Sequence, residues 1–392
     1  MNKQDISAMR REFKEDSAYL DIQQIYSVFM QAQTREVVHR EGGLFEMKDD
    51  EVRELFLGNF KKLLTGPLDS KLFELRFNPR EEAEEEAGQN LYYGFLRSDA
   101  IEDLAAVADK VIAKIADVYS YESDVVITFI KAQYRKAYRR KDNKPGESDT
   151  GEGFDDTQYA HPFIMCSVNK VTAPKRVLRF DPPSGVFSAN SALEIVVNLD
   201  APLEGFLFPA FTDNVSDVNS VIYYTAKSDQ RNFPFIETVL DCAYTLSASE
   251  EKEKFDEIIK VAVGEKAKAE TIKGIYEQIN ETIAYASEEE TPTVNLRAIQ
   301  TILQDNGVDT SSLESIYSEV TGGNFDFKAA NIIADYSAKS LKIETPHANI
   351  AISPQSLDAL KMVTDSRGVK CLLIEVGEDV QINGVVLAAE PL

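Results

Sequence analysis

Val125-Val-Ile-Thr-Phe-Ile130 consists entirely of β-branched and aromatic residues, the types that are enriched in strands. A nearly continuous apolar run of this length predicts a strand that is buried on both faces. The residues before it, from Ile101 to Val118, carry apolar side chains at helical spacing, and Ser98 or Asp99 provides a cap for that helix. A buried strand beside an amphipathic helix indicates a sheet with packed helices.

Similar patterns continue on both sides of this core. A strand is predicted from Ile25 to Gln31 with a hairpin partner from Arg35 to His39, and a helix follows Asp49 and Asp50 and ends at Gly66-Pro67. Further strand-like runs cover residues 71–77, 161–171, 193–199, 205–211 and 220–225. We therefore expect residues 1–245 to form one α+β main domain that contains a mixed sheet.

The pattern changes after Ser249. Residues 246–324 contain successive stretches with helical periodicity, which predict a helical segment. Residues 325–392 return to short strand-like runs, and Asn383-Gly384 predicts a tight hairpin turn within them. The predicted architecture is α+β: a mixed-sheet domain with packed helices, a helical segment and a small C-terminal β module. A chain of 392 residues is long enough for two or three such domains.

The composition is that of an acidic globular protein. A formal net charge of −24 repels phosphate backbones and anionic lipid, so nucleic acid is a disfavoured partner and a membrane is not expected as one. No apolar run approaches the roughly 18 residues of a membrane-spanning helix, and the first residues lack the apolar core of a signal peptide. Cys166, Cys242 and Cys371 lie far apart in apolar contexts, which is typical of buried thiols in a reducing compartment. We expect a cytoplasmic protein.

Several stretches along nearly the whole chain form a recognisable set: Met1–Lys14, Asn59–Gly66, Leu68–Leu75, Gly205–Phe211, Tyr223–Thr225, Ile343–Pro346, Cys371–Ile374 and Val380–Gly384. In sequence and in order, these stretches resemble the domain-of-unknown-function family 4317 of Firmicutes. The resemblance implies a bacterial, cytosolic protein whose three regions occur together as one unit. It carries over no activity, cofactor or functional residue.

A polar cluster between two apolar segments is the first candidate site. It contains Asp213 and Asp217, two carboxylates four residues apart. Such a pair is suited to binding a hard cation or to acid and base catalysis, which would make the protein a metal-dependent hydrolase. Asp, Asn and Ser are also the residues that form turns and caps, and we weigh that structural role above the functional one.

A basic cluster from Lys131 to Lys144 is the second candidate, and Tyr134 and Tyr138 are interleaved with its charges. Cations combined with stackable rings are typical of surfaces that bind phosphate backbones and single-stranded bases. The candidate contacts are Lys131, Arg135, Lys136, Arg139, Arg140, Lys141 and Lys144. The alternative, which we favour, is that these charges balance the acidic surface of the same molecule.

Motifs of common enzymes are absent from the sequence, which has neither a phosphate-binding glycine loop nor a nucleophile elbow. The leading hypothesis is therefore a non-enzymatic regulatory or interaction protein with a protein partner and no cofactor. The alternatives are a nucleic-acid-binding or nucleoid-associated protein that uses the basic cluster, and a hydrolase that uses Asp213 and Asp217.

Overall fold

The chain folds into two compact units, Met1–Ser247 and Ala248–Leu392. The computed structural model describes residues 1–79, 88–97, 101–136, 159–172, 178–189, 195–212, 215–264, 268–286, 291–333, 341–344, 349–353, 356, 359–376, 380–382, 385–386 and 388. No helix within these ranges is both long enough and apolar enough to cross a membrane.

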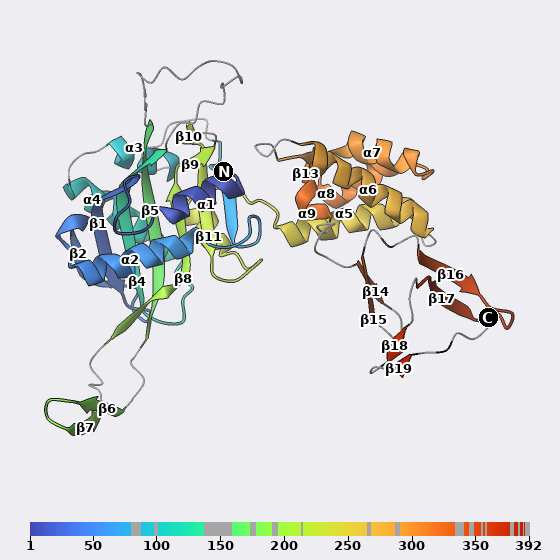
Figure 1. The fold of residues 1–392 in the computed structure, drawn as a ribbon. Coiled ribbons are helices and arrows are strands. Elements are labelled where there is room, and N and C mark those ends of the chain that lie inside the picture. Colours follow the sequence, from blue (N-terminus) through green and yellow to red (C-terminus); the bar gives the residue numbers. More distant parts are fainter. Residues whose placement is uncertain are drawn as a thin grey trace, which may run out of the picture. The chain divides into compact units, whose positions relative to one another are not determined.

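In the described part of the first unit, seven strands form one sheet in the order β2-β1-β4-β5-β8-β11-β3, and neighbouring strands are antiparallel (Figure 1). Their bounds are β1 Leu20–Met30, β2 Val37–Leu44, β3 Leu72–Arg76, β4 Val125–Lys136, β5 Tyr159–Thr172, β8 Val196–Phe208 and β11 Ser220–Thr225. The strand predicted from Val125 to Ile130 is confirmed as part of β4, which lies inside the sheet between β1 and β5. The α+β class is therefore confirmed, and the sheet that was predicted as mixed is antiparallel throughout its described strands.

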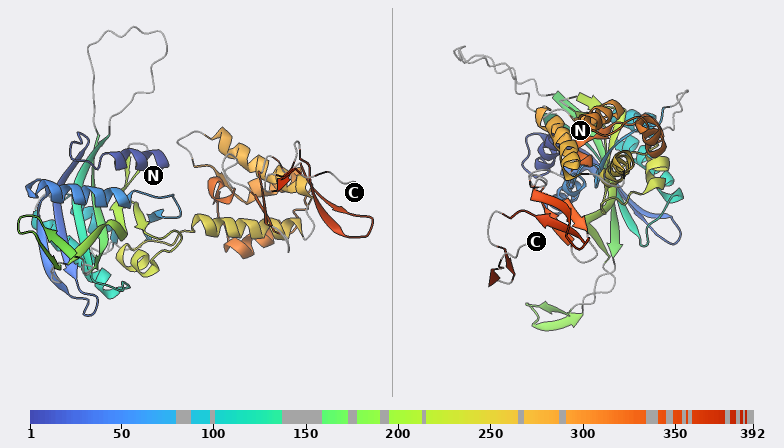
Figure 2. Two further views of the ribbon diagram at one scale, coloured as in Figure 1. Left: turned by 60° about the horizontal axis from the view of Figure 1, so that its bottom comes forward. Right: turned by 90° about the vertical axis from the view of Figure 1, so that its right-hand side faces the viewer.

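Helices cover both faces of this sheet (Figures 1 and 2). One face packs against α1 Lys3–Arg11 and α2 Asp50–Leu63, and the other against α3 Gly88–Arg97, α4 Ile101–Asp117 and the helical turn η2 Phe235–Val239. Side chains of β4 alternate between the two cores, so Ile127 and Phe129 lie on the α4 side while Ile130 and Ala132 lie on the α2 side. This explains why the first half of β4, from Val125 to Ile130, is apolar at nearly every position.

The helix α2 lies close against the sheet at Gly205 of β8. A Cβ atom at this position would lie 2.3 Å from the carbonyl oxygen of Cys166 and 2.8 Å from a methyl group of Leu63. Only glycine fits there. The remaining short elements of this unit are η1 Phe45–Met47, β6 Leu178–Asp181, β7 Val186–Ala189, β9 Ala210–Thr212 and β10 Val215–Asp217.

The second unit has its own core, formed by helices and one short strand pair. Its helices are α5 Ala248–Val263, α6 Ala269–Tyr285, α7 Leu296–Asp305, α8 Leu313–Thr321 and α9 Ala329–Ile332, and the strands β12 Thr293–Val294 and β13 Phe327–Lys328 pair. Three hairpins follow among the described residues: β14 Leu341–Glu344 with β15 Asn349–Ile352, β16 Leu360–Thr364 with β17 Lys370–Ile374, and β18 Gln381–Ile382 with β19 Val385–Val386. The last pair flanks Asn383-Gly384, which lies outside the described residues. The division of this unit at residue 324 stays a prediction.

Candidate functional site

Asp217 ends β10 and its carboxylate is used within its own loop. One oxygen accepts hydrogen bonds from the backbone N–H and the side chain of Asn219 at 3.0 and 3.1 Å, and the other accepts from the Ser220 hydroxyl at 2.7 Å. Partial burial opposes ionisation, but these hydrogen bonds outweigh it and lower the pKa of Asp217. Asp213 lies outside the described residues, and no group of three metal-binding side chains occurs within them. A cation site using Asp213 stays a prediction.

The residues of the basic cluster do not share one environment: Lys131 lies in the core, and most of the others lie outside the described residues. Lys131 is buried on β4, with its Nζ atom 5.5 Å from the ring centroid of Phe95 in α3, and Arg135 is exposed. Lys136 is described only by its backbone, whereas Arg139, Arg140, Lys141 and Lys144 lie outside the described residues. The role of this cluster in binding nucleic acid stays a prediction.

Glu204 on β8 is a buried carboxylate that the sequence analysis did not single out. One carboxylate oxygen accepts a hydrogen bond from the Tyr121 hydroxyl and another from the Asn232 side chain at 2.9 Å, and the second oxygen accepts from the Tyr223 hydroxyl at 2.9 Å. Asn232 also donates to the Ser120 hydroxyl at 3.1 Å. The only sequence signal is that Glu204 interrupts an apolar run that continues to Phe208.

Burial decides the chemistry of this carboxylate. Loss of hydration raises the pKa of Glu204 to about 7, although the three donors favour the ionised form. Burial and the nearby Glu204 charge raise the pKa of Tyr121 and Tyr223 well above the usual value, so both remain neutral donors. Because Glu204 is only 3% exposed, it is suited to holding a proton within the fold rather than to reacting with a substrate.

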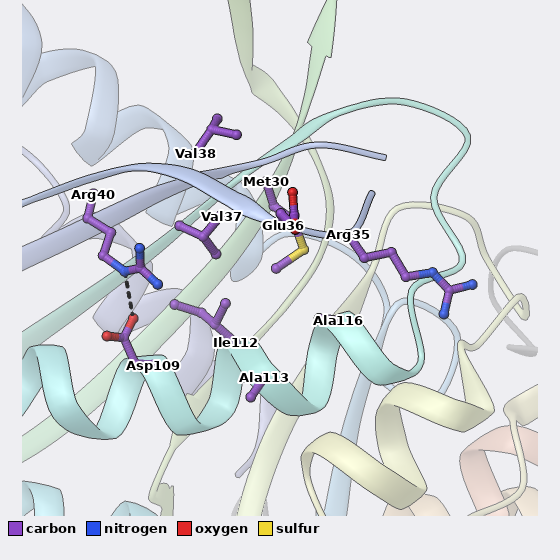
Figure 3. A pocket seen from close by; sticks show the side chains of 10 residues that line it. All are labelled: Met30, Arg35, Glu36, Val37, Val38, Arg40, Asp109, Ile112, Ala113 and Ala116. Atoms are coloured by element: carbon purple, nitrogen blue, oxygen red, sulfur yellow. Dashed lines mark hydrogen bonds and ion pairs between the residues drawn. The ribbon is translucent and has the colours of Figure 1, made fainter. Parts of the chain in front are cut away.

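An accessible hollow lies elsewhere in the first unit, between β2 and α4 (Figure 3). It is an open groove of about 400 Å³. Its walls combine an apolar set with a charged set: Met30, Val37, Val38, Ile112, Ala113 and Ala116, and Arg35, Glu36, Arg40 and Asp109. Val37 and Ile112 approach each other from the strand and from the helix, whereas Arg35 and Arg40 stand at opposite ends (Figure 3).

The two arginines of the groove differ in their surroundings. Arg40 donates to the carboxylate of Asp109 at 3.3 Å, and the same oxygen accepts from the Tyr26 hydroxyl at 3.1 Å. Burial and the Asp109 charge raise the pKa of Tyr26, which keeps its hydroxyl protonated as a donor. The Arg35 guanidinium is exposed, and it has no hydrogen-bond or ion-pair partner among the residues that the structure describes.

The strand that forms one wall of this groove is also an edge of the sheet. β2 pairs with β1 on one side, and within the described ranges its outer N–H and C=O groups make no backbone hydrogen bond. The opposite edge is covered differently: the N–H of Ala243 donates to the carbonyl of Arg76 in β3 at 2.9 Å, and Phe77 forms a bridge with Cys242. The β1–β2 hairpin was predictable from local sequence, whereas the groove was not, because Asp109 comes to Arg40 from 69 residues away.

The arrangement of β2, α4 and the groove is suited to binding a peptide-like segment. An unpaired strand edge offers main-chain hydrogen bonds, and an adjacent groove with an apolar wall accepts side chains of the added strand.

A family model described as a domain of unknown function (DUF4317) matches residues 1–385, which is nearly the whole chain. No curated protein and no solved structure matches this chain.

Proposed function

The chain belongs to the DUF4317 family, whose description assigns no activity, and from the geometry of its first unit we propose that it is a non-enzymatic interaction protein that binds an extended segment of a partner protein along β2. The observation that carries this proposal is the open edge of β2 beside the groove. In strand addition, main-chain hydrogen bonds provide affinity and pockets for alternate side chains provide specificity. β2 provides the open main-chain edge and also forms one wall of the groove.

The regularity of the edge supports this proposal. Within the β1–β2 pair, the register shift lies between Phe29 and Met30, so Val38 is an extra residue and the stretch from His39 to Leu44 pairs regularly. On the α4 side, the Arg40–Asp109 pair links the strand to the helix. The regular stretch from His39 to Leu44 is prepared for an incoming strand, because little backbone ordering remains on binding, whereas Val38 in the groove is the bulged residue.

A pair of matched variants tests the proposal. Ala113 lines the groove and is exposed, whereas Ala106 is exposed on the same helix and does not line it. Peptides would be selected from a random displayed library against the intact wild-type chain, and their affinities measured by fluorescence anisotropy. We expect Ala113→Phe to weaken binding at least tenfold by filling the groove, and Ala106→Phe to leave it unchanged.

Two results would overturn the proposal. One is a selection that yields no peptide dependent on the groove, so that Ala113→Phe and Ala106→Phe bind every selected peptide as the wild type does. The other is a peptide that binds without forming a strand. Added amide protection in β2, measured by hydrogen exchange of the complex, distinguishes strand addition from other modes of binding.

A further inference from the structure

The Arg35 guanidinium in the groove indicates which kind of segment fits there. The Arg35 side chain is exposed and no described residue pairs with its guanidinium, whereas Arg40 at the other end is already paired with Asp109. The backbone of Arg35 has a φ of +60°, a conformation that is uncommon for residues other than glycine. Its N–H donates to the carbonyl of Gln31 at 2.9 Å, which fixes the turn that presents the side chain.

Apolar side chains form most of the wall between the two arginines, and Glu36 and Asp109 also line the groove. Met30 and Ile112 are buried beneath it, Val37 is partly exposed, and Ala113 leaves the space that a larger side chain would fill. An apolar side chain of a bound segment would be stabilised in proportion to the apolar surface that it buries on this wall. The groove thus provides an apolar subsite next to the Arg35 guanidinium, which pairs with no described residue, and the adjacent Glu36 also lines it.

We infer that the segment bound along β2 presents a carboxylate to Arg35 and, on the same face, an apolar side chain to the wall formed by Val37, Ile112 and Ala113. This inference rests on the proposed function and adds the chemistry of the partner. Alternate side chains of a strand point to one face and lie about 6.7 Å apart, and neighbouring side chains on that face would occupy the two subsites. A guanidinium is well suited to a carboxylate because its N–H groups match both oxygens.

Two synthetic peptides and two arginine variants test the inference. In the first peptide, Thr occupies every second position, and Glu and Val occupy the positions between, so that Glu and Val lie on one face of the strand. The second peptide has Gln in place of Glu. Arg35→Gln removes the groove charge, and Arg11→Gln removes an exposed charge on α1 as the control. Binding to the full chain is measured by isothermal titration at low and at high salt.

We expect the wild type to bind the Glu peptide about fivefold more tightly than the Gln peptide at low salt, which is the upper range for an exposed ion pair. High salt should remove this preference, because it screens exposed charges. Arg35→Gln should abolish the preference, and Arg11→Gln should retain it.

The failure of this inference is distinguishable from the failure of the proposed function. In one outcome, both peptides bind equally, Arg35→Gln changes neither affinity, and Ala113→Phe still weakens binding at least tenfold. The carboxylate subsite is then wrong, whereas the proposed binding of a strand along β2 stands. If neither peptide binds at any salt concentration, the inference is wrong as well. If, in addition, Ala113→Phe binds the peptides selected from the library as tightly as the wild type does, both the inference and the proposed function are wrong.

Discussion

The buried carboxylate of Glu204 makes the stability of the first unit depend on pH. Its ordinary pKa is 4.5, and burial raises the folded-state pKa to about 7. Below pH 4.5 the group is protonated in both states, and its contribution to stability is fully present. As the pH rises from 4.5 through 7, the unfolded chain releases the proton first, so the free energy of unfolding falls.

The size of this effect follows from the shift in pKa. A difference of about 2.5 pKa units corresponds to about 3 kcal/mol, since one unit is about 1.4 kcal/mol. Glu204→Gln keeps the shape and cannot ionise. Its amide oxygen can accept from Tyr121 and Asn232, and its amide N–H can donate to the hydroxyl of Tyr223. The free energy of unfolding of the wild type falls between pH 4.5 and pH 8 because of Glu204, whereas that of the variant lacks this change. We therefore expect the difference, variant minus wild type, to rise by about 3 kcal/mol over this range.

The assay must report on the first unit alone, because two compact units need not unfold together. Native-state hydrogen exchange of peptides from β8 and β11, compared between wild type and variant at the same pH, provides this measurement. Glu237→Gln, which changes an exposed glutamate on η2, serves as the control and should give no pH-dependent difference. If the difference between Glu204→Gln and wild type were the same at pH 5 and pH 8, the raised pKa of Glu204 would be refuted.

Two further predictions concern the packing of α2 on the sheet. Gly205→Ala should lower the free energy of unfolding of the first unit by about 3 kcal/mol, because the new methyl group meets the carbonyl of Cys166 and the side chain of Leu63; a thermal shift within error of wild type would contradict the close approach. Asn59→Ala should cost about 2 kcal/mol, because the Asn59 amide donates to the Leu199 carbonyl at 2.7 Å and to the buried Asn169 side chain at 2.6 Å. Urea unfolding followed by circular dichroism checks the second prediction, and an unchanged midpoint would show that water replaces these bonds.

The elements of the fold were predictable where their signals are local. The β-branched run from Val125 to Ile130 and the helical periodicity after Ile101 identified a central strand and its neighbouring helix. The strands predicted on either side of Asn383-Gly384 are confirmed as the pair β18 and β19. These signals depend on the conformational preferences of residues a few positions apart, so the chain carries them whatever its tertiary arrangement.

The candidate site was not predictable, because its parts come from distant positions. Lys131 belongs to a basic run in the sequence, yet strand alternation turns its side chain into the core beneath α3. Glu204 meets a tyrosine hydroxyl from 83 residues away, and Arg40 meets Asp109 from 69 residues away. By itself the sequence determined the α+β class, most of the helices and strands, and the acidic surface. Strand order decided that β2 is an edge and that α4 lies beside it, since pairing between remote strands depends on packing of the whole core rather than on any local pattern.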